Sequence, residues 1–424
     1  MTEATTTRES PGHQLKVQLH DVQQARELLK GVIVDTPLEH SRALGRMLGA
    51  TVHLKAENLQ RAGSFKVRGA YVRMARLSDE EKSRGVVAAS AGNHAQGVAL
   101  AAKKLGVEAT IFMPRGVALP KLAATRDHGA EVVLHGSNVD EALAEAQRHS
   151  EESGAVFIHP FNHTDVVAGQ GTIGLEILEQ QPDVDTVLMG IGGGGLLAGS
   201  AVALKQEAAR QGRDIKLIGV QAENAAAYPP SLAADALVPL QAVRTIADGI
   251  AVGRPGEIPF EIIKELVDDV VTVSEDAIAK ALIFLMERSK LVVEPAGAVG
   301  VAALMEGKLA ELGIKPESVV AVLSGGNIDP MLMLRVIQHG LSAADRFLTV
   351  KLMLKDRPGE LAIISRIIAD TDANVIGVDH SRIGGALSMG DVSIVINMET
   401  KGSEHSALVL NSLRAEGYEP LVMH

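Results

Sequence analysis

Residues 186–210 read TVLMGIGGGGLLAGSAVALKQEAAR, and this stretch decides the class of fold. An apolar run, Thr186–Gly190, leads into four glycines and then into an Ala- and Leu-rich stretch of helical period. A short apolar run followed by a helix is typical of a buried parallel strand in an α/β protein. Glycines at such a junction let successive backbone N–H groups surround an anion at the positive end of the helix. The stretch therefore predicts an α/β fold that binds a phosphate-bearing ligand.

The same alternation of apolar runs and helical stretches extends over much of the chain. Further apolar runs lie at 86–89, 109–113, 131–134, 156–159, 216–220, 269–273 and 319–323. Ligands of open α/β sheets bind beyond the carboxyl ends of the strands, where polar, glycine-rich segments follow several of these runs. We therefore expect one pocket at this edge. A flexible linker and a dinucleotide-binding fold are alternatives, but the glycines lie between strand and helix, and no clear ribose ligand or Walker spacing accompanies them.

Composition excludes several classes of protein. The 424 residues carry a formal net charge of −11, no cysteine, and only ten aromatic side chains, 7 Phe and 3 Tyr. An acidic chain with few aromatics disfavours nucleic acid as a partner, and the lack of cysteine excludes disulfides and thiolate chemistry. No apolar run reaches the 18 residues of a membrane span, and the scattered histidines predict no metal site. We expect a cytoplasmic enzyme with a disordered tail over residues 1–14.

The pattern changes near residues 342–346, where we place a domain boundary. Strand-like runs at about 347–354, 374–383, 391–398 and 418–422 alternate with helical stretches at about 360–370 and 403–416. Glycines 384 and 385 separate the second strand from the third. This order, βαββαβ, predicts a ferredoxin-like domain over residues 346–424, behind a catalytic domain over residues 15–341.

A second segment of chemical interest is Ser64–Ala70, a polar turn that leads into a helix. Ser64 would cap a helix that starts near Arg68, and Lys66 would lie at the positive end of that helix. The free amine of a lysine in such a place is accessible for Schiff-base chemistry. Taken alone, one lysine among many is more often a solvated surface residue.

Four motifs together resemble the threonine/serine ammonia-lyases, which are fold type II enzymes that use pyridoxal 5′-phosphate (PLP). The motifs are Ser64-Phe65-Lys66, Ser90-Ala91-Gly92-Asn93-His94, Gly192-Gly193-Gly194-Gly195-Leu196 and Ser324-Gly325-Gly326-Asn327, in the order of that family. The resemblance covers about residues 15–340 and implies two parallel-sheet α/β subdomains. The segment after residue 346, with Asp356–Leu361 between its first strand and helix, resembles an ACT domain, an amino-acid-sensing module.

The resemblance implies a role for each matching residue. Lys66 would carry PLP as a Schiff base beside Phe65, Asn93 would bond the 3′ oxygen of the ring, and Ser324 would face the pyridine nitrogen. Backbone donors from Gly192, Gly193, Gly194, Gly195 and Leu196 would hold the phosphate. Ser90, Asn93 and His94 would bind the substrate carboxylate.

A neutral serine at the ring nitrogen favours prompt loss of a β-substituent over a long-lived carbanion, because serine cannot keep that nitrogen protonated. We infer that Lys66 removes the α-proton of the substrate, and that the β-hydroxyl leaves with a proton from the cofactor phosphate. Threonine would then give 2-oxobutanoate and ammonia, the first step toward isoleucine. Serine is the other candidate substrate, because one methyl group is worth only roughly 1–3 kcal/mol in a fitted pocket.

Two alternatives stay open. Serine racemases share these motifs but have a serine as second base just before the Gly-Asn of the asparagine loop, where this chain has Ala91. A catalytically silent amino-acid sensor would not need an intact Lys66, Asn93 and Ser324. Some relatives bind a cation near Gln221–Ser231, but Glu223 alone does not predict a metal here.

The ACT-like segment predicts allosteric control by a branched-chain amino acid, isoleucine first and valine second. The effector would bind around Asp356, Gly359, Glu360, Leu361 and Asn374 at the shared edge of paired domains. Paired sensing domains require a homo-oligomer, either a dimer or a tetramer.

Overall fold

The computed structural model describes residues 15–343, 346–382 and 390–423. Contacts between residues divide the chain into two units, one reaching to residue 329 and the other starting at residue 330, with residues 282–284 grouped with the second. Helix α15 (Pro330–Ala343) packs against strand β11 (Phe347–Lys355) of the second unit. The division therefore falls before this helix, whereas the sequence analysis placed the boundary after it.

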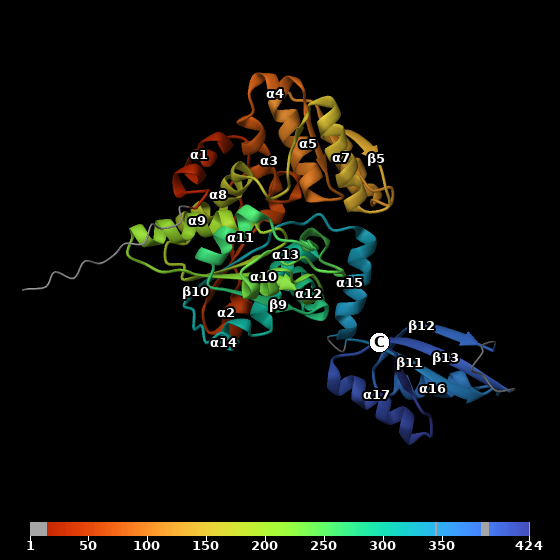
Figure 1. Ribbon diagram of the computed structural model, residues 1–424. Helices are drawn as coiled ribbons and strands as arrows, with labels where there is room; N and C mark the ends of the chain where they lie inside the picture. Colours follow the sequence, from red (N-terminus) through yellow and green to blue (C-terminus); the bar gives the residue numbers. More distant parts are fainter. Residues whose placement is uncertain (1–14, 344–345, 383–389, 424) are drawn as a thin grey trace, which may run out of the picture. The chain divides into compact units, whose positions relative to one another are not determined.

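The larger sheet of the first unit has six strands, in the order β1-β2-β10-β7-β8-β9. Two of them, β9 and β10, are labelled in Figure 1. All neighbouring strands are parallel except β1 and β2. Every residue of β7 and β10 is buried, because helices cover both faces of the sheet. The strands are β1 (Leu38–His40), β2 (Thr51–Lys55), β7 (Thr186–Gly190), β8 (Lys216–Ala222), β9 (Asp269–Val273) and β10 (Ser318–Val322). The accompanying helices are α1 (Leu19–Leu29), α2 (Arg42–Leu48), α9 (Gly195–Arg210), α10 (Tyr228–Ala234), α11 (Glu257–Leu266), α12 (Glu275–Phe284), α13 (Pro295–Met305) and α14 (Lys308–Glu311), with a π-helical turn at Leu285–Ser289.

A smaller sheet of four parallel strands, in the order β5-β4-β3-β6, forms the rest of the first unit. In Figure 1 this part runs from orange to yellow. Its strands are β3 (Val86–Ala89), β4 (Ala109–Met113), β5 (Glu131–Leu134) and β6 (Val156–Phe157). Its helices are α3 (Lys66–Ala75), α4 (Asp79–Ser83), α5 (Asn93–Leu105), α6 (Leu119–Asp127), α7 (Val139–Ser153) and α8 (Thr164–Gln180).

Glycines allow helix α8 to pack closely against two neighbours. A Cβ atom on Gly169 of α8 would lie 2.7 Å from the Cα of Gly69 in α3, and one on Gly199 of α9 would lie 2.0 Å from the Val167 carbonyl oxygen of α8. No side chain fits at either distance, so a larger residue would push the helices apart. This packing sets the position of α3, which begins with Lys66.

The second unit contains a four-stranded antiparallel sheet in the order β12-β13-β11-β14. Its elements are β11, α16 (Glu360–Ala369), β12 (Asn374–Ser381), β13 (Asp391–Glu399), α17 (Ser403–Ala415) and β14 (Leu421–Met423). The alternate residues Leu348, Val350 and Leu352 of β11 are buried against Ile364 and Ile368 of α16. The order βαββαβ is the predicted ferredoxin-like topology. The predicted end of the second strand at Ile383, and the glycines 384 and 385, lie outside the described residues.

The predicted fold class is confirmed: two parallel α/β subdomains and a small antiparallel C-terminal domain. Five strands, at 86–89, 109–113, 131–134, 186–190 and 269–273, have the predicted bounds. None of the helices in the described ranges is long and apolar enough to cross a membrane.

Candidate active site

A cavity of about 940 Å³ opens at the carboxyl ends of the strands of the two parallel sheets. Every cofactor- and substrate-binding residue predicted from the sequence lines it: Phe65, Lys66, Ser90, Asn93, His94, Gly192, Gly193, Gly194, Gly195, Leu196 and Ser324. These residues come from loops that follow β3, β7 and β10 and from the start of α3. The fold thus brings together segments that lie far apart in the sequence.

Lys66 is the first residue of α3. Its Nζ atom donates a hydrogen bond to the Pro160 carbonyl oxygen (3.3 Å) and lies 5.1 Å from the centre of the Phe65 ring. Burial lowers the pKa of the Lys66 amine to about 8, although the Glu294 carboxylate acts in the opposite direction. Roughly a tenth of this amine is therefore unprotonated at pH 7, far more than for an ordinary lysine, and the unprotonated form is the one that a nucleophile or base requires.

Ser64 does not cap this helix, contrary to the sequence-based prediction. The helix begins at Lys66, two residues before the predicted start, and Phe65 is its N-terminal flanking residue. Ser64 instead forms a bridge with Gly325, and the Phe65 N–H donates to the Ser324 carbonyl oxygen (3.2 Å). Backbone pairing between the two motifs therefore fixes the start of α3, and no side-chain cap is needed.

The glycine run forms a cradle of unused donors at the start of α9. In the described part of the chain, no acceptor pairs with the N–H groups of residues 192–196. Gly194 has a φ of +98°, a conformation that strongly favours glycine. Unpaired N–H groups at a helix N-terminus form a binding site for an anion such as a phosphate group.

Asn93 belongs to a hydrogen-bonded network that the sequence did not reveal. Its Nδ2 donates to Glu294 Oε1 (2.5 Å), and its Oδ1 accepts from Asn327 Nδ2 (2.9 Å). The two contacts determine which end of the Asn93 amide carries the donors. A Cβ atom on Gly325 would lie 2.4 Å from Glu294 Oε1, so only glycine leaves room for this carboxylate. In the sequence, Glu294 stands out only as the first residue of a Glu-Pro-Ala-Gly segment, and its chemistry alone predicts no role for it.

Glu294 is 3% exposed and lines the cavity. Burial, together with the negative charge of Asp248, raises the pKa of the Glu294 carboxyl group to about 7. Hydrogen bonding to Asn93 and the positive charges of Lys121 and Lys66 oppose this shift. The carboxyl group can therefore change its charge near neutral pH.

A second set of free donors lies at the start of α5. The N–H groups of Asn93 and His94 have no acceptor among the described residues, and the Ser90 Oγ accepts from the Gly92 N–H (3.1 Å) while its own proton stays available. The His94 ring donates from Nε2 to the Ile158 carbonyl oxygen (2.8 Å), and burial lowers its pKa to about 3. The neutral ring then has no proton on Nδ1, so His94 can meet a carboxylate only through its backbone.

Ser324 lies at the carboxyl end of β10 and is 5% exposed. Its Oγ is 3.5 Å from the Ala296 carbonyl oxygen, a long hydrogen bond that leaves the hydroxyl free to pair with a ligand. Three features of the cavity thus fit PLP: an amine of lowered pKa, a cradle of N–H donors and a neutral hydroxyl group.

The predicted effector residues belong to the second unit, and none of them lines this cavity. Asp356 pairs with Arg382 (2.8 Å), the Glu360 carboxylate accepts from the Tyr418 hydroxyl (3.1 Å), and Asn374 donates to Glu399 (3.2 Å). Gly359 has a φ of +97° at the start of α16, and Leu361 is 36% exposed.

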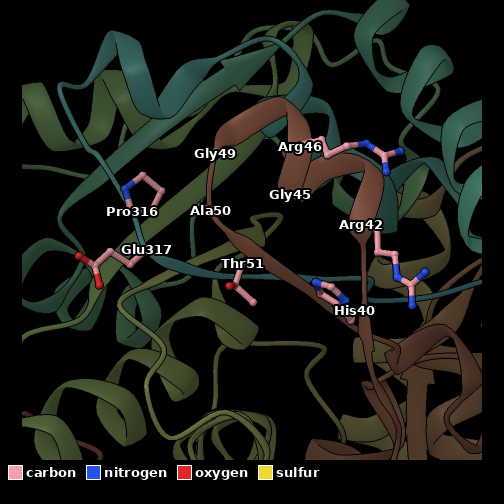
Figure 2. Close-up of a pocket in the computed structure, with 9 residues that line it drawn as sticks. All are labelled: His40, Arg42, Gly45, Arg46, Gly49, Ala50, Thr51, Pro316 and Glu317. Carbon is pink, nitrogen blue, oxygen red and sulfur yellow. The ribbon is translucent and has the colours of Figure 1, made fainter.

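A second hollow lies on the first unit, between α2 and the start of β10 (Figure 2). Its lining residues are His40, Arg42, Gly45, Arg46, Gly49, Ala50, Thr51, Pro316 and Glu317. None of the residues singled out from the sequence lines this hollow. Across the described ranges, no three His, Asp or Glu side chains are grouped closely enough to hold a metal ion.

The fold and the cavity define an enzyme of the PLP-dependent class. A family model described as "Pyridoxal-phosphate dependent enzyme" matches residues 29–325. Within this class, the chain belongs to the threonine ammonia-lyase family, on the evidence of the relatives that follow.

The chain is 46% identical to an L-threonine ammonia-lyase of Thermotoga maritima, over 95% of this chain and 98% of the relative. It is also 46% identical to an L-threonine ammonia-lyase of Geobacter sulfurreducens, over 94% of this chain and 97% of the relative. Among solved structures, the processed form of threonine deaminase isoform 2 from Solanum lycopersicum matches with a TM-score of 0.71 and 38% identity, over 79% of this chain and 93% of that chain. Maize serine racemase matches with a TM-score of 0.72 and 34% identity, over 77% of this chain and 98% of that chain.

Proposed function

We propose that this enzyme deaminates L-threonine by β-elimination of water, giving 2-oxobutanoate and ammonia, and that it accepts L-serine as well. The observation that carries the proposal is the Lys66 amine, with its pKa of about 8, in a cavity that also holds two sets of unpaired N–H donors. Such donors bind anions, and we assign one set to the phosphate of the cofactor and the other to the carboxylate of the substrate. The names of the relatives support threonine as substrate.

The cofactor would be held by backbone and side-chain groups of the first unit. The N–H groups of Gly192–Leu196 would bind its phosphate, Ser324 its ring nitrogen, and Asn93 its phenolic oxygen, with Phe65 beside the ring. When bound, PLP withdraws electrons from the Cα atom of an attached amino acid and makes the α-proton acidic.

Lys66 would act as the base of the reaction. The unprotonated Lys66 Nζ would accept the proton from the substrate Cα atom, because burial lowers the pKa of this amine. The Ser90 hydroxyl and the backbone N–H groups of Asn93 and His94 would hold the substrate carboxylate at the start of α5. This hold would keep the Cα–H bond in reach of Lys66.

Elimination is favoured over racemisation by the side chain at position 91. Ala91 lines the cavity, and its methyl group cannot deliver a proton to the second face of the substrate. A racemase needs such a group. The structural similarity to serine racemases therefore reflects the shared fold and cofactor site.

A spectrum and an assay test the proposed reaction. The purified enzyme with PLP is expected to show a visible absorption band that shifts on adding L-threonine while 2-oxobutanoate accumulates. Lys66→Ala should lose both effects, with activity lower by more than about a thousand-fold. Lys104→Ala, which replaces an exposed lysine of α5, is the matched control and should behave as wild type.

Two results would contradict the proposal. A protein that stays colourless and inert with added PLP would favour a silent sensor. A protein that makes D-threonine and no 2-oxo acid would favour a racemase.

We further propose that the second unit is an ACT domain through which isoleucine, or else valine, controls the enzyme as the first step toward isoleucine. Its ferredoxin-like topology, the exposed Leu361 in the first turn of α16 and the exposed Asn374 on the edge strand β12 support this assignment. The enzyme would act in the cytoplasm as a homo-oligomer, because paired ACT domains bind the effector at their shared edge.

A further inference from the structure

The carbonyl oxygen of Gly193 is held by two hydrogen-bond donors. The Tyr228 hydroxyl donates to it at 3.2 Å, and the Gly256 N–H donates at 3.1 Å. Tyr228 is completely buried at the start of α10, and burial raises the pKa of its hydroxyl, which stays protonated and able to donate. Gly193 lines the active-site cavity, whereas Tyr228 does not.

This contact determines the direction of the next N–H group. In a trans peptide, the C=O and N–H bonds point to opposite sides of the chain, and the described residues contain no cis peptide bond. The hydroxyl that holds the Gly193 carbonyl therefore turns the Gly194 N–H away from Tyr228. The contact is also tight, because a Cβ atom on Gly194 would lie 1.9 Å from the Tyr228 hydroxyl oxygen.

Gln221 at the end of β8 ties Tyr228 to the strand that precedes the glycines. Its Oε1 accepts from the Tyr228 N–H (2.9 Å), and its Nε2 donates to the carbonyl oxygen of Ile191 (3.2 Å). Gln221 is fully buried, so these bonds compete little with water. Gln221 and Tyr228 are joined through the Tyr228 N–H, and their side chains hold the carbonyl groups of Ile191 and Gly193, respectively.

We propose that Tyr228 is a positioning residue for the cofactor phosphate, which aims the Gly194 N–H into the cavity without touching the cofactor itself. The inference rests on the proposed binding of the PLP phosphate by residues 192–196. Without the hydroxyl, the Gly193–Gly194 peptide keeps only its bond from Gly256 and has more freedom to rotate. The phosphate would then meet a less well oriented donor, and PLP would bind more weakly.

The test compares two probes on the apoenzyme, PLP and pyridoxal, which lacks the phosphate. Both can react with Lys66, so their affinity ratio isolates the contribution of the phosphate site. Tyr228→Phe keeps the ring and removes only the hydroxyl. We expect it to weaken PLP about five-fold, the loss of one hydrogen bond, and to leave the affinity for pyridoxal unchanged. Absorbance titration gives both dissociation constants.

Tyr71→Phe is the matched control, because Tyr71 lies on α3 and does not line the cavity. It should leave the PLP-to-pyridoxal ratio unchanged. Equal weakening of both probes by Tyr228→Phe, or no change in either, would overturn the inference. A wild-type enzyme that binds pyridoxal as tightly as PLP would instead refute the phosphate site itself, so the two failures can be told apart.

Discussion

Burial shifts the pKa values of two side chains of the cavity, Lys66 and Glu294, in opposite directions. Burial disfavours charge, so it lowers the pKa of the Lys66 amine to about 8 and raises the pKa of the Glu294 carboxyl group to about 7. Glu294 also holds the Asn93 amide, which would contact the cofactor ring. The charge of the Glu294 carboxyl group therefore acts on the pKa of Lys66, the proposed base, and on the hydrogen bond of Asn93, a proposed cofactor-binding residue.

The raised pKa of Glu294 makes the stability of the apoenzyme depend on pH. The folded state binds this proton more tightly than the unfolded state, so the free energy of unfolding falls as pH rises from about 4.5 to about 7. Relative to Glu294→Gln, the wild type should lose on the order of 3 kcal/mol between pH 5 and pH 8. Urea unfolding of the apoenzyme at both pH values measures the difference.

Glu151→Gln is the control for this experiment, because Glu151 is exposed on α7. It should change with pH in parallel with the wild type. Parallel curves for Glu294→Gln and the wild type would show that burial does not shift this carboxyl group.

At the scale of elements, a buried ionic network anchors the helix that carries Lys66. Arg68, fully buried in α3, donates to Glu57 after β2 (2.7 Å and 2.8 Å) and to Glu176 of α8 (2.5 Å and 3.0 Å). Lys55 of β2 adds a contact to Glu176 (2.7 Å). These bonds tie α3 to the large sheet and to α8, and so hold Lys66, the proposed base, relative to both subdomains.

Removing the centre of this network should be costly. Arg68→Met removes the cation that pairs with both buried carboxylates and leaves Glu57 with the Thr36 hydroxyl (2.6 Å) and Glu176 with Lys55. We expect a loss of about 3–5 kcal/mol in the free energy of unfolding.

Arg148→Met, which breaks exposed ion pairs with Glu145 and Glu152 on α7, is the control and should leave the urea midpoint unchanged. Equal effects of the two substitutions would show that the network does not anchor the helix.

At the scale of the whole molecule, the two units suggest a division into catalysis and sensing. An effector changes activity only if it binds two states of the enzyme unequally. The predicted effector residues lie in the second unit and every predicted cofactor-binding and substrate-binding residue lies in the first.

Asn374→Ala in the full chain should weaken inhibition by isoleucine while kcat and KM for threonine in its absence stay as in the wild type. The inhibitory concentration of isoleucine should rise about ten-fold, because one amide contact is removed. Asn411→Ala on α17 is the control. Unchanged inhibition would remove this edge of the sheet from the proposed effector site.

Paired sensing domains also predict the mass of the enzyme in solution. Light scattering should give at least twice the 44.6 kDa of one chain. A single species with the mass of one chain would exclude effector binding at a shared edge.

The fold class and the glycine run proposed to bind phosphate follow from the sequence alone, because they depend on local periodicity and on a glycine-rich loop at the end of a strand. Lys66 was singled out by the resemblance of four motifs to a known family, because one lysine among many carries no signal of its own. The pattern of apolar runs missed β1, which has only three residues, and β2, whose sequence Thr51–Lys55 alternates polar and apolar side chains instead of forming a continuous apolar run. Only the tertiary structure decided what surrounds those motifs. Glu294 meets Asn93 across 201 positions of sequence, Tyr228 meets Gly193 across 35, and the pKa shifts follow from burial. Contacts between distant segments and exclusion of water arise only when the chain packs, so no local pattern records them.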